Sequence, residues 1–223
     1  IKYSDYLRIN NINLGSCIVM DSPRKFANLN TPIINLIKCL TVATSFILAA
    51  PVFADTKQDL IDACSSKIVA YDFDSALPSC TKAAELGDVL AQYELGFMHS
   101  QGKGTPKDYK QAVYWYTKAA EQGDAQAQFN IGLMHSKGIG TPQNYKQAIH
   151  WYTKAAEQGL VVAQYNLGLM YKDGEGTPQD YKQAIYWYTK AAEQGFANAQ
   201  YNLGITHAYG KGTPKDDKQA IYW

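Results

Sequence analysis

Ser79 and Lys82 form the S-x-x-K spacing of penicillin-recognising serine enzymes, in which the serine is the nucleophile. The S-D-N and K-T-G motifs that accompany this spacing in those enzymes occur nowhere in the sequence. A four-residue pattern of common residues also arises readily by chance. The pair by itself therefore predicts no enzyme, and we expect both residues to belong to an ordinary helix.

Imidazole rings recur at a fixed spacing of 36 residues, at His99, His135 and His207, with Tyr171 at the equivalent place. A zinc site needs each histidine nitrogen at about 2.0–2.1 Å from the metal, whereas packed helices lie about 8–10 Å apart. No third ligand is evident. The spacing favours rings that line a groove or are partly packed, and we predict neither a metal nor another cofactor.

The segment Gly102-Lys103-Gly104-Thr105 has some features of a phosphate-binding loop. That loop requires glycine where Phe97 stands, and serine or threonine directly after the lysine, where Gly104 stands. It also follows a strand, which is not expected here. These glycines therefore predict a tight turn.

The chain after residue 87 consists of one unit repeated at a period of 36 residues, which predicts a solenoid. We place the units at 88–123, 124–159, 160–195 and 196–223, and expect further repeats after the last, partial one. The recurring residues are Trp115, Trp151, Trp187, Trp223, Pro106, Pro142, Pro178, Pro214, Gly87, Gly123, Gly159 and Gly195. We expect the tryptophans to pack between successive units.

Each unit predicts two antiparallel helices of about 11–14 residues. Asp88 and Asp108 are candidate N-caps, and Gly123 is a candidate C-terminal stop. Gly96 lies beside the apolar stripe and would let a neighbouring helix approach closely. Since neither helix can bury its stripe alone, we expect an all-α, right-handed superhelix of about 4.5 units.

Residues 55–87 align with a shortened unit that lacks the glycine-rich turn, which is typical of a capping repeat. Cys64 and Cys80 would face each other across its helical hairpin. In an oxidising compartment a disulfide is favoured, and two buried free thiols are the alternative.

Residues 1–54 have the layout of a secretory signal peptide and its upstream sequence. Met20 is a candidate start, a basic segment follows, and the apolar stretch 40–50 leads to a cleavage site after Ala54. We therefore expect a periplasmic or secreted protein with no stable membrane insertion after cleavage. From residue 55 on, 16 lysines, no arginine and 18 acidic residues argue against nucleic-acid binding.

The repeat resembles the Sel-one-like repeat family, relatives of the tetratricopeptide repeats. The matching segments are AQYNLGLMY at 163–171, GEGTPQDY at 174–181 and AIYWYTKAAEQG at 184–195. The resemblance implies a protein-binding adaptor or scaffold and not an enzyme. Some cysteine-rich secreted proteins similar to this family bind or hydrolyse β-lactams, which is one alternative, and a secreted effector that binds host proteins is another.

In such solenoids the first helix of each unit usually lines the concave side. A helix wheel places two rows of residues opposite the apolar stripe. They are Gln92, Gln128, Gln164 and Gln200, and His99, His135, Tyr171 and His207. These rows suit an extended peptide or an exposed protein segment as partner. The alternative is that the glutamines only bridge neighbouring units.

Overall fold

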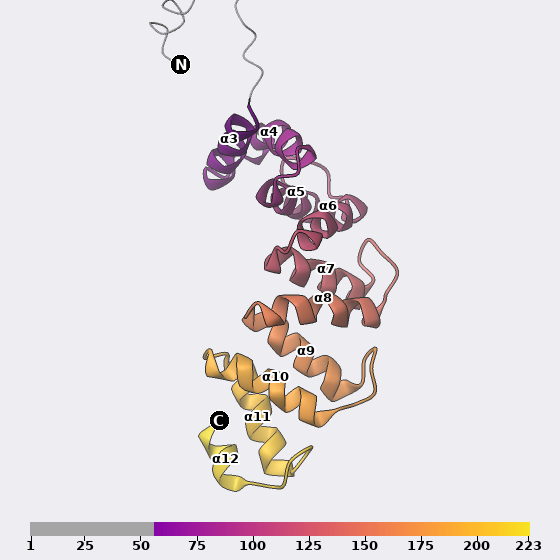
Figure 1. Cartoon of the computed structure of the whole chain (residues 1–223), viewed down its shortest axis with the longest axis vertical. Helices are drawn as coiled ribbons and strands as arrows, with labels where there is room; N and C mark the ends of the chain where they lie inside the picture. The colour runs from indigo at the N-terminus through magenta and orange to yellow at the C-terminus, as the bar shows by residue number, and fades with distance from the viewer. Residues whose placement is uncertain (1–55) are drawn as a thin grey trace, which may run out of the picture. The chain divides into compact units, whose positions relative to one another are not determined.

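The computed structural model describes residues 56–223, and the predicted signal peptide lies outside the described residues. Helices account for all the regular secondary structure of this part of the chain. They are labelled as in Figure 1. Their bounds are α3 Lys57–Val69, α4 Phe73–Glu85, α5 Val89–Gln101, α6 Tyr109–Glu121, α7 Ala125–Lys137, α8 Tyr145–Glu157, α9 Val161–Asp173, α10 Tyr181–Glu193, α11 Ala197–Tyr209 and α12 Asp217–Tyr222.

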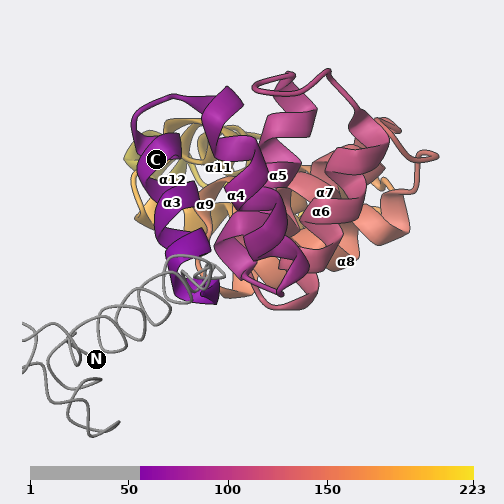
Figure 2. The same cartoon turned by 90° about the horizontal axis from the view of Figure 1, so that it is seen from above.

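The helices pair into hairpins that follow one another in series, and each helix packs against the next one along the chain (Figures 1 and 2). Contacts between helices that are far apart in sequence are almost absent within residues 56–223. This arrangement is an all-α solenoid like that of the tetratricopeptide repeats, as the period of the sequence predicted. Among the described helices none is long and apolar enough to cross a bilayer.

The helices begin and end where the sequence supplies the capping groups. The Asp88 carboxylate accepts a hydrogen bond of 2.8 Å from the Ala91 amide at the start of α5. Gly102 ends the same helix with a φ of 70°, a left-handed conformation that glycine adopts without strain. Leu160 and Phe196 replace the capping aspartate before α9 and α11, and neither offers a side-chain bond.

A glycine in each first helix lies directly against a tyrosine ring of the second helix. A Cβ atom added to Gly132 would come within 2.8 Å of Cδ1 of Tyr152. Gly96 faces Tyr116 and Gly168 faces Tyr188 in the same way. The glycine therefore sets the close approach of the two helices, and the tyrosine fills the space that the missing side chain leaves.

The glycine-rich turns dock onto the preceding unit. Gly104 has a φ of 67°, and a Cβ atom there would collide with the backbone of Phe73 at the start of α4. Gly140 meets the backbone of Tyr109 in the same way. These glycines thus serve tight turns and a contact between units, and they do not form a phosphate loop.

The tryptophans pack between units, as predicted. Trp151 of α8 is buried together with Ala112 and Tyr116 of α6 and Ile131 of α7. Trp187 is buried in the same manner one unit later. Each apolar cluster therefore combines side chains of two neighbouring units, so no unit has a complete core of its own.

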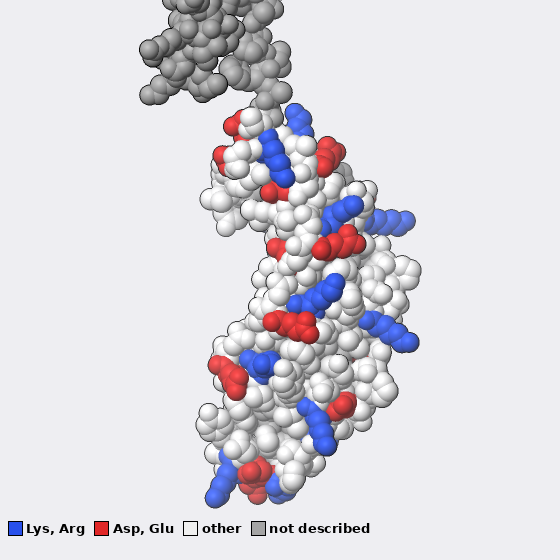
Figure 3. All heavy atoms as spheres, in the orientation of Figure 1, with Lys and Arg blue, Asp and Glu red and all other residues white. Residues whose placement is uncertain are grey.

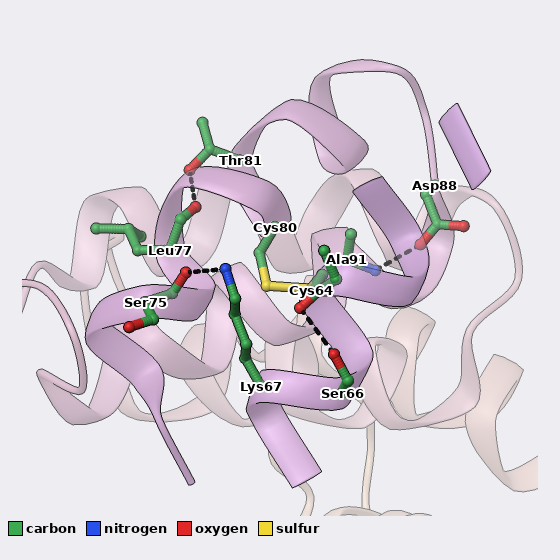
Figure 4. The surroundings of a disulfide bond; sticks show 10 residues. Cys64, Ser66, Lys67, Ser75, Leu77, Cys80, Thr81, Asp88 and Ala91 are labelled. Carbon is green, nitrogen blue, oxygen red and sulfur yellow. Dashed lines mark hydrogen bonds between the residues drawn. A yellow bond between two sulfur atoms is a disulfide. The ribbon is translucent and has the colours of Figure 1, made fainter. Parts of the chain in front are cut away.

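The first described hairpin, α3 and α4, contains a disulfide between Cys64 and Cys80 (Figure 4). Both cysteines are buried, with their Cα atoms 4.7 Å apart. Counted from the helix N-caps, Cys64 stands where Gly96 stands in the next unit, and Cys80 aligns with Tyr116. The covalent bond thus replaces the glycine–tyrosine contact in this hairpin, and a loop of this size contributes about 2–4 kcal/mol.

Candidate functional site

The glutamines that the helix wheel placed on an open stripe lie inside the solenoid. Gln128 is 3% exposed, and its Nε2 donates a hydrogen bond of 3.1 Å to the Ala120 carbonyl at the end of α6. Gln158, which follows α8, donates from Nε2 to the Gln128 Oε1 atom at 2.7 Å and to the Gly123 carbonyl at 3.0 Å. The Ala120 carbonyl also accepts a hydrogen bond of 3.1 Å from the Gly123 amide, so Gln128 supplies a second donor at the end of α6.

The same bridge recurs in the neighbouring units. Gln92 is paired with Gln122, and Gln164 with Gln194. Gln92 and Gln164 are buried, whereas Gln200 is half-buried and bonds to the Ala192 carbonyl at 3.3 Å. These contacts match the bridging alternative, and Gln92 also lines a hollow of about 520 Å³ together with Trp115 and Gln122. The second glutamine of each pair was missed, although it recurs in the sequence at the same period.

The three histidines are partly buried. The Nδ1 atoms of His99, His135 and His207 are buried and have no hydrogen-bond partner among the described residues. Burial lowers the pKa of His99, an effect that the nearby Asp108 carboxylate opposes, and burial lowers the pKa of His135 as well. Tyr171 takes the equivalent place against the apolar clusters of two units. In residues 56–223 no group of three potential ligands could hold a metal.

Ser79 and Lys82 both lie on α4. Ser79 is half-buried, Lys82 is exposed, and no hydrogen bond joins their side chains in the described part of the chain. Nothing in this geometry activates the serine hydroxyl, so it supplies no catalytic arrangement.

A different set of side chains remains accessible on the first helices. We call it the first-helix face, and it consists of two rows with the same period. They are Tyr93, Phe129, Tyr165 and Tyr201, and Phe97, Leu133, Leu169 and Ile205. All are half-buried except Tyr201, which is 68% exposed. These rows were missed because half-buried aromatic residues are indistinguishable from core residues in a sequence.

The first-helix face also includes the polar residue that directly follows each ring of the first row, which is an asparagine at positions 130, 166 and 202. Asn166 donates from Nδ2 to the Val162 carbonyl at 2.7 Å, and Asn202 donates from Nδ2 to the Tyr165 hydroxyl at 3.4 Å. Their side-chain oxygens accept no hydrogen bond from residues 56–223, so they remain available as acceptors. In the first unit the same position carries Glu94.

The surface is hollowed along this face. A hollow of about 390 Å³ lies between α5 and α7 and is lined by Tyr93, Phe97, Asn130 and Leu133, among others. A second hollow, of about 400 Å³, lies at the N-terminal end of the described helices. The first-helix face therefore offers shallow depressions lined by both apolar and polar side chains.

The charged side chains do not indicate a binding site on the face that Figure 3 shows. Lysines and acidic residues are interspersed over the surface in Figure 3, with no extended area of one sign on the side shown. Only two ion pairs occur among the described residues, both exposed and both between near neighbours in sequence. Such isolated surface pairs contribute little to stability.

The repeat can be matched to a known family. The model of the Sel1 repeat matches residues 89–124, 125–160, 161–196 and 197–223, more than half of the chain. The chain belongs to the Sel1 repeat family. Sel1 repeat proteins generally mediate protein–protein interactions and are mostly scaffolds without enzymatic activity.

Two solved structures of Sel1 repeat proteins resemble this one. One is a Sel1 repeat protein from Oxalobacter formigenes, 36% identical with a TM-score of 0.68, and the match covers 71% of this chain and 65% of that one. The other is c5321, a protective antigen of uropathogenic Escherichia coli strains, 31% identical with a TM-score of 0.70, covering 87% of this chain and 41% of that one. This Sel1 repeat chain thus spans less than two thirds of either relative. A search of curated proteins finds no significant match.

Proposed function

We propose that this protein is an exported adaptor that binds a segment of another protein along the first-helix face, on the concave side of the solenoid. The observation that supports this best is the pair of apolar rows that recur in every unit from α5 onward and remain accessible. Sel1 repeat proteins generally bind other proteins, which agrees with the proposal. The disulfide supports an oxidising compartment, where such bonds persist.

The face suits an extended peptide. Aromatic rings such as Phe129 and Tyr165 give large apolar contacts at a small entropic cost, and they are enriched at protein interfaces. The free oxygens of Asn166 and Asn202 can accept hydrogen bonds from peptide N–H groups. Since the face combines rings and amides and carries few charges, binding would depend on shape and hydrogen bonds along several units.

This proposal moves the binding site away from the glutamines. The amides of Gln92, Gln128 and Gln164 hold neighbouring units together, so replacing them would weaken the solenoid itself. Some residues of the binding site predicted from the sequence can still border a bound segment. They are Gln200 and the half-buried rings of His99, His135, Tyr171 and His207. The first-helix face supplies the main contacts in this proposal.

A pair of photo-crosslinking variants tests the proposal. A photoreactive phenylalanine analogue replaces either Asn166, on the first-helix face, or Tyr186, which is exposed on the second helix of the same unit. We expect the probe at residue 166 to crosslink a partner protein from envelope or host-cell extracts, and the probe at residue 186 to crosslink none. Equal crosslinking from both positions, or crosslinking only from residue 186, would contradict the proposed face.

A further inference from the structure

The first unit differs from the others at one position of the first-helix face. Glu94 of α5 stands where Asn130, Asn166 and Asn202 stand in the later units. Its side chain is half-buried, and among the described residues it has neither a hydrogen-bond donor nor an ion-pair partner. Partial burial raises the pKa of this carboxyl. A half-buried carboxylate without a partner loses part of its hydration, and no hydrogen bond or ion pair offsets that loss. A cation that binds beside it would therefore stabilise its charged form.

Aromatic and aliphatic side chains surround this carboxylate. The hollow of about 400 Å³ at the N-terminal end of the face is lined by Glu94 together with Ile68, Tyr71, Phe73, Tyr93 and Phe97, among others. The rings of Tyr71 and Phe73 meet edge to face with their centroids 6.3 Å apart, and the Phe73 and Phe97 centroids are also 6.3 Å apart. Faces of aromatic rings attract cations, and alkyl chains pack well against such walls.

The chain itself already places an ammonium group on these rings. The Nζ atom of Lys103 lies 4.7 Å from the centroid of Phe73 and 5.0 Å from that of Phe97. It does not come within ion-pair distance of Glu94, whose carboxylate is left without a counter-ion in the described residues. Lys103 belongs to the turn after α5, so its side chain can leave the rings for solvent.

We infer that this hollow is a subsite for one lysine side chain of the bound segment. The methylene groups of that lysine would pack against Ile68 and Phe97, and its ammonium group would pair with Glu94 and displace Lys103 from the aromatic rings. This inference rests on the proposed function, because it assigns one end of the same face to a basic residue of the partner. A lysine bound in this subsite would fix which residues of the segment contact each of the following units.

Small amides test the subsite without any knowledge of the partner. Nα-acetyl-lysine amide is titrated into the full chain, and the backbone signals of Tyr93 and Glu94 are followed by ¹H–¹⁵N NMR spectroscopy. Nα-acetyl-norleucine amide, which keeps the alkyl chain and lacks the ammonium group, is the matched ligand. We expect the lysine amide to bind about fivefold more tightly than the norleucine amide. Equal binding of the two amides would overturn the inference.

Two substitutions copy residues that other units carry at the same positions, so the fold accommodates them. Glu94→Asn, as in the later units, should weaken binding of the lysine amide about fivefold. Lys103→Glu, the residue at position 175 of the third unit, removes the competing cation and should strengthen binding about threefold. A melting temperature equal to that of the unmodified chain shows that each variant is folded.

A third variant separates charge from shape. Glu94→Gln keeps the shape of the side chain and removes its charge, so it should lose as much affinity as Glu94→Asn. If either variant binds the lysine amide like the unmodified chain, the subsite is wrong. The crosslinks from residue 166 then decide the broader proposal independently, because that position lies two units away.

Discussion

The Nε2 atom of Gln158 donates a hydrogen bond of 2.7 Å to the Oε1 atom of Gln128, 30 residues earlier in the chain. The Gln128 amide in turn donates to the Ala120 carbonyl at the end of the preceding unit. One pair of side chains thus connects the ends of two second helices through the first helix that lies between them. Because the pair recurs in each complete unit, the solenoid contains a continuous series of such bridges.

Replacing Gln128 by alanine should destabilise the protein by about 1–3 kcal/mol, because it removes two hydrogen bonds, one to the buried Ala120 carbonyl and one from the Gln158 amide. Urea unfolding followed by circular dichroism measures the change. Gln143→Ala is the matched control, because its amide also donates to a helix carbonyl, that of Ser136 at 2.9 Å, but this bond is exposed. Equal losses at the two positions would show that burial of the amide is not the cause.

Reduction of the Cys64–Cys80 bond should lower the melting temperature, since it removes a crosslink worth about 2–4 kcal/mol from the hairpin of α3 and α4. Melting curves with and without a reducing agent measure the effect, and peptide mapping after alkylation of the native protein should find neither Cys64 nor Cys80 modified. An unchanged midpoint together with alkylation of both of these cysteines would refute the disulfide.

Leucine at position 132 should overpack the contact between the helices of the second unit and cost about 1–3 kcal/mol, because a Cβ atom there already lies 2.8 Å from the Tyr152 ring. The same substitution in a Tyr152→Ala background is the control, because that background lacks the ring that the leucine would meet. Chemical unfolding measures the cost of the leucine in the two backgrounds. A cost as large without the ring as with it would argue against the tyrosine as the cause.

The hydroxyl of Tyr188 is buried without a hydrogen-bond partner among the described residues, whereas the Tyr152 hydroxyl lies 3.4 Å from Ser136 Oγ. Tyr188→Phe should therefore leave the stability unchanged or raise it by about 1 kcal/mol, because it removes an unbonded polar group. Tyr152→Phe should lower the stability slightly. Parallel urea titrations distinguish the two, and a clear loss for Tyr188→Phe would show that its hydroxyl has a partner in solution.

Acidification should destabilise the protein through the packed histidines. Burial holds the pKa values of His99 and His135 below the ordinary value of 6.5, so the unfolded chain binds more protons than the folded one once the pH falls below about that value. The contribution of these two rings to the free energy of unfolding is therefore fully present above that pH. It decreases as the pH falls from there towards the pKa values that the rings have in the folded state.

The pH effect is measured as the melting temperature at pH 7.5 and at pH 5.5. The variant His135→Tyr carries the residue that the third unit has at this position, Tyr171, and it should show a smaller decrease than the unmodified chain. Glu94 acts in the opposite direction, because burial raises its pKa above 4.5 and the folded chain therefore binds its proton more tightly than the unfolded chain does. An identical decrease in the variant would exclude His135 as a contributor.

Much of the fold was predictable because it depends on local chemistry that repeats. Asp88 and Asp108 mark helix starts, Gly123 marks a stop, and the spacing of Gly96 indicates a close helix contact; the structure confirms each of these. The disulfide followed from two cysteines on facing helices. The glutamine row was harder, because a helix wheel shows which residues share a face and does not show what covers that face.

The sequence by itself determined the unit, its length and the two helices within it, because caps, turns and apolar spacing act over a few residues. Only the tertiary structure decided that Gln128 faces inward and that Glu94 and Phe129 remain accessible. The physical reason is that burial in a solenoid depends on side chains one unit away. There the end of a neighbouring helix presents carbonyl groups that accept the glutamine amides, and the aromatic rows of the first helices are only half-buried by the clusters they pack against.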